Sequence, residues 1–129
     1  MIANVAAGVA AFAQCVIALV EMAFWMVPKV HSDLFFNEDE ARKVAPIVQN
    51  AGLYNAFLAA GLIWGFVDRS NREKIFTFFL ACVAIAGVFG ALTLKSKMQE
   101  KIPIPLTLVI QTLPAAIGLA AIWWPHASR

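Results

Sequence analysis

The stretch "QNAGLYNAFLAAGLIWG", residues 49–65, is apolar enough for a membrane-spanning helix, yet it carries four polar side chains near its start. They are Gln49, Asn50, Tyr54 and Asn55. Polar and ionisable side chains inside membrane spans face the bundle interior or a water-filled cavity rather than lipid. The stretch therefore predicts a transmembrane helix with an inward-facing polar sector.

The composition of the whole chain agrees with a membrane protein. Of the 129 residues, 61% are hydrophobic and 14% are charged, and the mean hydropathy is +0.75. Soluble proteins carry roughly 25% charged residues. The net charge of +2 is small, and the basic residues form no stripe that a nucleic acid would bind. We exclude nucleic acid as a partner and expect the lipid bilayer.

Four apolar segments follow one another, each close to the ~20 residues that a helix needs to cross ~30 Å of hydrocarbon. They cover about residues 4–27, 46–67, 75–94 and 103–124. The four tryptophans, Trp25, Trp64, Trp123 and Trp124, lie near segment ends, as in an interfacial aromatic belt. The connections are too short for a soluble domain. We expect an all-α fold, a four-transmembrane-helix antiparallel bundle that forms one integral membrane domain over residues 1–129.

The distribution of basic residues favours one orientation in the cell membrane. The first and third connections carry Lys29, Arg42, Lys43, Lys95, Lys97 and Lys101, and the other side carries Arg69, Arg72, Lys74 and Arg129. By the positive-inside rule, this bias leans toward both termini outside the cytoplasm. No positive region precedes the first apolar segment, so we expect a retained helix rather than a cleaved signal peptide.

The first connection contains a helix-start signal. Asn37 is followed three residues later by Glu40, which is the spacing of a capping box. It predicts a helix that continues, with a bend at Pro46, into the second span. A solvated turn whose charges keep it in water explains the same residues equally well.

The helix rise of ~1.5 Å per residue gives the depth of each polar residue below the membrane surface. Polar residues of several spans lie at a similar depth. Glu21 lies roughly 10 Å in from the side of the first and third connections, and Gln111 roughly 12 Å. The polar residues of the opening stretch lie roughly 6 to 13 Å in from the same side. We expect one inward-facing polar pocket that serves as a ligand-binding or proton site, formed by Glu21, Asn50, Tyr54, Asn55, Gln111 and Trp25.

Small residues predict how the helices pack. Gly61 and Gly65 form a G-x-x-x-G pair, which is typical of close helix contact in membranes. Pro114 removes an amide donor, so we expect the fourth helix to bend near Gln111.

The sequence contains no metal-ligand spacing, phosphate loop or nucleophile elbow. His31 and His126 lie toward opposite membrane faces, which argues against a shared metal site. Cys15 and Cys82 lie in apolar surroundings and are interpreted as small buried hydrophobes rather than a disulfide. We expect no cofactor and no bound metal, and no catalytic residue is identified.

The motifs "EMAFW" (21–25), "QNAGLYNAFLAAGLIWG" (49–65), "AGVFGALT" (86–93) and "QTLPA" (111–115) resemble the small bacterial membrane proteins of the family called domain of unknown function 1304. The resemblance covers nearly the whole chain in order. It implies the four-span fold and a bacterial inner-membrane location, and it implies no established activity.

Three classes of function fit these residues. A charged acid inside a span costs ~2.5 kcal/mol or more unless it is neutralised or paired. Glu21 therefore suggests binding or transport of a proton or a small cationic or amphipathic molecule, and its alternative role is a structural acid sharing hydrogen bonds. The second class is an accessory subunit of a larger membrane complex, or a homo-oligomer, docking through G-x-x-x-G faces. The third is a lipid-modifying enzyme with Glu21 as acid or base. We rank binding or transport first, the subunit second and the enzyme third.

Overall fold

The computed structural model describes the backbone of residues 1–127 and the side chains of residues 1–124. Within this part the chain is all-helical and contains no strand. The helices in chain order are α1 (Ile2–Leu19), η1 (Val20–Phe24), α2 (Pro28–Asp33), α3 (Glu38–Val67), α4 (Arg72–Thr93), α5 (Lys97–Lys101), η2 (Leu108–Thr112) and α6 (Leu113–Ala127). The elements η1 and η2 are single π-helical turns, which continue α1 and precede α6 without a break.

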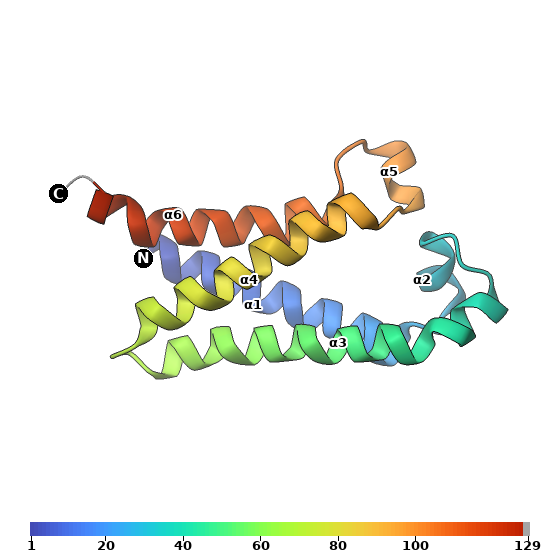
Figure 1. Ribbon diagram of the computed structural model, residues 1–129, viewed down its shortest axis with the longest axis horizontal. Helices are drawn as coiled ribbons and strands as arrows, with labels where there is room; N and C mark the ends of the chain where they lie inside the picture. Colours follow the sequence, from blue (N-terminus) through green and yellow to red (C-terminus); the bar gives the residue numbers. More distant parts are fainter. Residues whose placement is uncertain (128–129) are drawn as a thin grey trace.

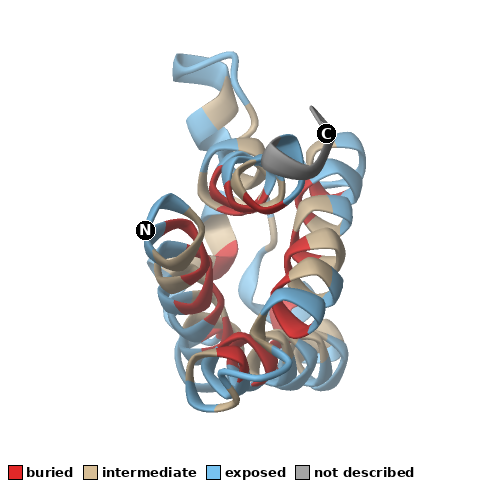
Figure 2. Ribbon diagram, turned by 90° about the vertical axis from the view of Figure 1, so that its left-hand side faces the viewer, coloured by how far each residue is buried: buried red, intermediate tan, exposed pale blue. Residues whose placement is uncertain are grey.

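The long helices are arranged so that each packs against two others. Helix α1 contacts α3 and α6, and helix α4 contacts the same two. Figure 1 shows these helices running along the length of the molecule, with the short helices α2 and α5 at the end away from the N-terminus. Seen along their length in Figure 2, the buried surfaces face one another at the centre and the exposed surfaces face outward.

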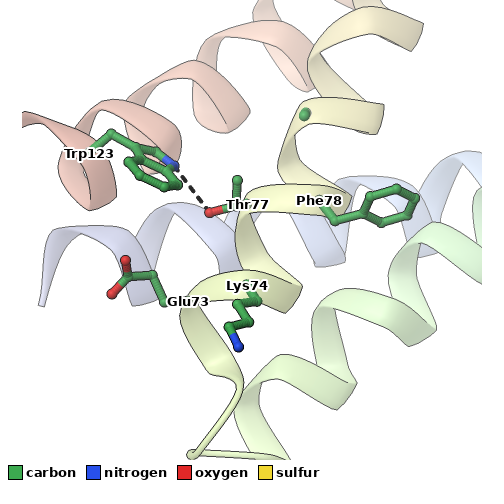
Figure 3. Close-up of a pocket in the computed structure, with 6 residues that line it drawn as sticks. Glu73, Lys74, Thr77, Phe78 and Trp123 are labelled. Carbon is green, nitrogen blue, oxygen red and sulfur yellow. Dashed lines mark hydrogen bonds between the residues drawn. The ribbon is translucent and has the colours of Figure 1, made fainter.

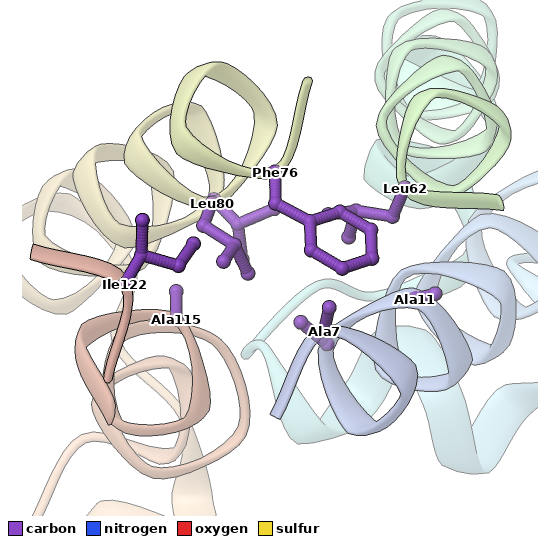
Figure 4. Packing of buried hydrophobic residues seen from close by; sticks show 9 residues of the cluster. Ala7, Ala11, Leu62, Phe76, Leu80, Ala115 and Ile122 are labelled. Atoms are coloured by element: carbon purple, nitrogen blue, oxygen red, sulfur yellow. The ribbon is translucent and has the colours of Figure 1, made fainter. Parts of the chain in front are cut away.

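The core joins all four long helices through apolar side chains. Alanines of α1 and α6 face larger residues of α3 and α4 (Figure 4), and the cluster comprises Ala7, Ala10, Ala11, Leu62, Phe76, Leu80, Val83, Ala115 and Ile122. Large apolar side chains also cover the outside, where Phe12 is 72% and Leu92 is 81% exposed. An outer surface of this kind suits lipid, because hydrocarbon tails are as apolar as these side chains.

Three helices of the described chain are long and apolar enough to cross a membrane, which is the pattern of a membrane protein. They are Ile2–Phe24, Glu38–Val67 and Arg72–Thr93. The fourth predicted segment, residues 103–124, begins later than expected, because its apolar helix covers only Leu108–Trp124. Two prolines explain the late start: Pro103 and Pro105 disfavour helical backbone in the residues that precede them.

The predicted capping box at the start of α3 is confirmed. Asn37 Oδ1 accepts a hydrogen bond from the Glu40 amide at 2.9 Å, and the Asn37 amide donates to Glu40 Oε2 at 3.0 Å. From this cap, α3 runs through Pro46 as one helix of 30 residues. At 1.5 Å per residue that is about 45 Å, longer than the ~30 Å hydrocarbon core, so part of α3 extends beyond it.

The G-x-x-x-G pair is a packing surface, but aromatic rings fill it rather than a second helix backbone. A Cβ on Gly61 would collide with the Phe79 ring, and one on Gly65 would collide with the Phe76 ring. Both rings belong to α4. The expected contact at this pair is therefore made with α4, and each glycine accommodates a phenylalanine ring of that helix.

Candidate functional site

The carboxylate of Glu21 is held by one hydrogen bond from the neighbouring long helix. Asn55 Nδ2 of α3 donates to Glu21 Oε2 at 2.7 Å, and Glu21 is partly buried. Gly52 lies one turn before Asn55, where a Cβ would come within 3.0 Å of Glu21 Cβ and 3.2 Å of the Ala18 carbonyl oxygen. The missing Cβ allows α3 to approach α1 and η1 closely enough for the hydrogen bond to form.

Glu21 lies in a π-helical turn, η1, rather than in regular α-helix. Single π-turns inside α-helices are rare and frequently occur at functional sites. None of the five residues of this turn is fully buried. The turn packs principally against α1 and α3. Its outward side chains are apolar, with Met22 44% and Phe24 48% exposed. Glu21 is thus a polar group at a helix boundary, partly open on an apolar surface.

Trp25 has a structural role that its sequence position did not reveal. Its side chain is only 3% exposed, and Nε1 donates to the Ala41 carbonyl oxygen at 2.9 Å. The ring also packs edge-on against Phe36 and tilted against His31. Trp25 thus lies near the end of its segment with an enclosed ring, because α2 folds against the start of α3.

Two of the predicted site residues face away from the helix contacts. Asn50 is exposed, and Tyr54 is 59% exposed with its ring edge-on to Phe57. The prediction that these two face inward is wrong. Asn55 lies about 100° further round the helix than Tyr54, so when Asn55 points at Glu21 the other two side chains point outward.

Gln111 is buried in η2, only 6% exposed. The π-turn ends where the Leu113 amide donates to the Leu108 carbonyl oxygen, close to the bend that Pro114 predicts. A π-turn therefore lies where the sequence predicts a bend, and the bend itself stays a prediction. Gln14 of α1 is fully buried at 0% exposure. Its position seven residues before Glu21 was the signal available in the sequence, since such residues share a helix face.

Other predicted features lie apart from this pair. Cys15 and Cys82 are both free thiols, and the expectation that Cys15 is buried is wrong, because its side chain is exposed. No group of three or more metal-ligating side chains occurs among the described residues, and the side chain of His126 lies outside them. A groove of about 560 Å³ is lined by residues of α4 and by Trp123 of α6. At this groove Trp123 Nε1 donates to Thr77 Oγ1 at 3.2 Å (Figure 3). None of the predicted site residues lines it.

No curated protein and no solved structure matches this chain. A family described as "Protein of unknown function (DUF1304)" matches residues 8–123, a range that contains the Glu21–Asn55 pair and both π-turns. The chain therefore belongs to the DUF1304 family.

Proposed function

We propose that the protein crosses the membrane four times as an antiparallel bundle, with η2 and α6 as the fourth span. The five residues of η2 and the fifteen of α6 form one continuous helix, which at 1.5 Å per residue reaches about 30 Å, the thickness of the hydrocarbon core. Four spans put both termini on one side of the membrane, and three put them on opposite sides. Protease protection of tags at the two termini distinguishes these arrangements.

We further propose that the Glu21–Asn55 pair is a proton site that binds a small lipophilic cation in exchange. One observation carries this proposal: Glu21 is a partly open carboxylate inside a helix that could span the membrane, and its hydrogen-bond donor is a neutral amide. Glu38 pairs with Arg42 at 2.9 Å, whereas no ion pair involves Glu21 among the described side chains.

The energetics of a membrane carboxylate support this exchange. An unpaired charge in a span costs at least ~2.5 kcal/mol, and a proton or a bound cation removes that cost. Asn55 orients one carboxylate oxygen, which leaves the second oxygen for the ligand. The same π-turn carries the exposed apolar side chains of Met22 and Phe24, which suit a ligand that carries its charge on an apolar body. The proposal therefore names a lipophilic cation rather than a hydrated metal ion.

Binding of tetraphenylphosphonium to the protein in detergent micelles tests the proposal. Affinity should rise with pH, because protons compete for the same carboxylate, and Glu21→Gln should abolish both the binding and its pH dependence. Glu100→Gln, on the exposed helix α5, is the matched control and should bind like the natural chain. Equal binding by the Glu21→Gln variant at every pH would remove Glu21 from the mechanism.

The accessory-subunit hypothesis is weaker than the sequence suggested. It relied on G-x-x-x-G faces as docking surfaces, and the rings of Phe79 and Phe76 cover Gly61 and Gly65 within the chain. We therefore keep binding or transport as the proposed function.

A further inference from the structure

Gln14 presents a complete amide to the interior of the helix assembly with no partner inside the protein. The side chain is 0% exposed, and neither Nε2 nor Oε1 has a hydrogen-bond partner among the described residues. Leaving a buried donor or acceptor unsatisfied costs about 1–3 kcal/mol for each group. Buried polar side chains are therefore almost always bonded to protein or to an ordered water molecule.

A second buried amide lies at the same level on the opposite helix. Helix α1 contacts η2, and Gln111 is the residue of η2 that is buried. The register between α1 and α6 follows from Gly118 of α6, where an added Cβ would lie 3.4 Å from Ala6 Cβ of α1. From there, Gln14 is eight residues further along α1, about 12 Å, and Gln111 is seven residues back along the antiparallel helix, about 10 Å. The two amides thus lie at one depth.

A third polar group lies at Thr107, the residue directly before η2. Thr107 Oγ1 is buried and has no partner among the described residues. Thr107 lies four residues before Gln111, so the two side chains share one helix face. It packs against α4, where a Cβ on Gly90 would lie 3.1 Å from Thr107 Cγ2. Polar groups therefore line the contact between α1, α4 and η2.

The two unpartnered atoms of Gln14 define the chemistry of the missing partner. Nε2 donates and Oε1 accepts, so the partner must accept and donate at once. A bare cation would satisfy oxygen atoms only and would leave Nε2 unbonded. Water has both capacities, and a buried water typically makes about three hydrogen bonds to otherwise unsatisfied groups.

We propose that Gln14 anchors an internal water site between α1, α4 and η2, with Gln111 and Thr107 as its further hydrogen-bonding groups. The site is separate from the Glu21–Asn55 pair, because Gln14 lies seven residues and about 10 Å away along α1. It therefore does not depend on the proposed cation exchange.

Nuclear magnetic resonance of the ¹⁵N-labelled natural chain in micelles tests the site directly. The side-chain amide protons of Gln14, assigned by sequential connectivity and by their loss in Gln14→Met, should show a cross-peak to water although the side chain is enclosed. Asn37, whose side chain is exposed and lies outside the predicted spans, is the positive control. A Gln14 amide without a water cross-peak, in a sample where the Asn37 cross-peak is present, overturns the proposal.

A double-mutant cycle gives an independent test. If one water network joins the two amides, Gln14→Met and Gln111→Met should each raise the unfolding constant about fivefold or more, because each leaves the remaining groups unsatisfied. The double variant should then be less affected than the product of the two factors. In a dry interior, Gln14→Met should be more stable than the natural chain and the two factors should multiply, which would contradict the water site.

Discussion

Replacing Gly52 with alanine should separate α3 from η1 and weaken the Glu21–Asn55 hydrogen bond. The added Cβ would lie 2.6 Å from Met22 Cγ, 3.0 Å from Glu21 Cβ and 3.2 Å from the Ala18 carbonyl oxygen. The methionine can rotate away, but the backbone oxygen cannot. Overpacking of this kind costs about 1–3 kcal/mol.

Gly8→Ala is the matched control for this change. Gly8 also lies in a helix that is long and apolar enough to span a membrane. A Cβ added there would contact only Phe66 Cζ, at an ordinary van der Waals distance of 3.7 Å. Both variants gain the same helix propensity, roughly 1 kcal/mol. The difference between them therefore isolates the cost of the close contact, about 1–3 kcal/mol.

Unfolding of the two variants by sodium dodecyl sulfate in mixed micelles, followed by tryptophan fluorescence, measures this difference. Gly8→Ala should be as stable as the natural chain or more stable, and Gly52→Ala should be less stable than Gly8→Ala and should bind tetraphenylphosphonium more weakly. Equal stability of the two alanine variants would refute the close approach of α3 to η1.

Three further substitutions test contacts around the site and at the helix ends. Trp25→Phe keeps an aromatic ring but loses the hydrogen bond to Ala41, so it should lower the unfolding free energy by about 0.5–1.5 kcal/mol, measured in the same micelles; no change would mean that the bond contributes nothing. Asn37→Ala should cost about 0.5–2 kcal/mol by removing the cap of α3, with faster amide hydrogen exchange in its first turn, and unchanged exchange there would contradict the cap. Hydrogen bonds from the side chain and backbone of Asn71 lower the pKa of Asp68. The stabilisation from these hydrogen bonds is therefore fully present above the usual aspartate pKa. It is lost as the pH falls from that value through the lowered pKa of the folded state. Asn71→Ala removes the side-chain hydrogen bond and should raise the Asp68 pKa in a carbon-13 titration, and an unchanged pKa would exclude the Asn71 side chain as a cause.

The sequence predicted local features of the fold more accurately than the rotation of each helix. The Asn37 cap and the irregular backbone near Pro114 follow from short-range chemistry and appear in the structure. The inward face of α3 was predicted from its polar residues, and Asn50 and Tyr54 proved to be exposed. Hydrophobicity cannot separate the inside from the outside of a membrane helix, because lipid is as apolar as the core.

The small residues of α3 indicate its inward face more accurately than its polar residues do. Gly52 and Ala59, seven residues apart on α3, are both buried, and Asn55 lies between them. Residues at these spacings share one helix face. A prediction based on these small residues places Asn55 on the inward face of α3 and Tyr54 off it. The role of Trp25 could not be predicted in this way, because it depends on how α2 folds back over the end of η1.

Proton release on cation binding tests the central claim, that Glu21 exchanges a proton for a lipophilic cation. The protein in weakly buffered micelles is mixed with tetraphenylphosphonium at a pH where binding is half-suppressed, and released protons are counted with an indicator dye. The natural chain should release a substantial fraction of a proton, and at most about one, for each cation bound, whereas Glu21→Gln should release none. Binding by the natural chain without proton release, or equal release by Glu21→Gln, would contradict the exchange.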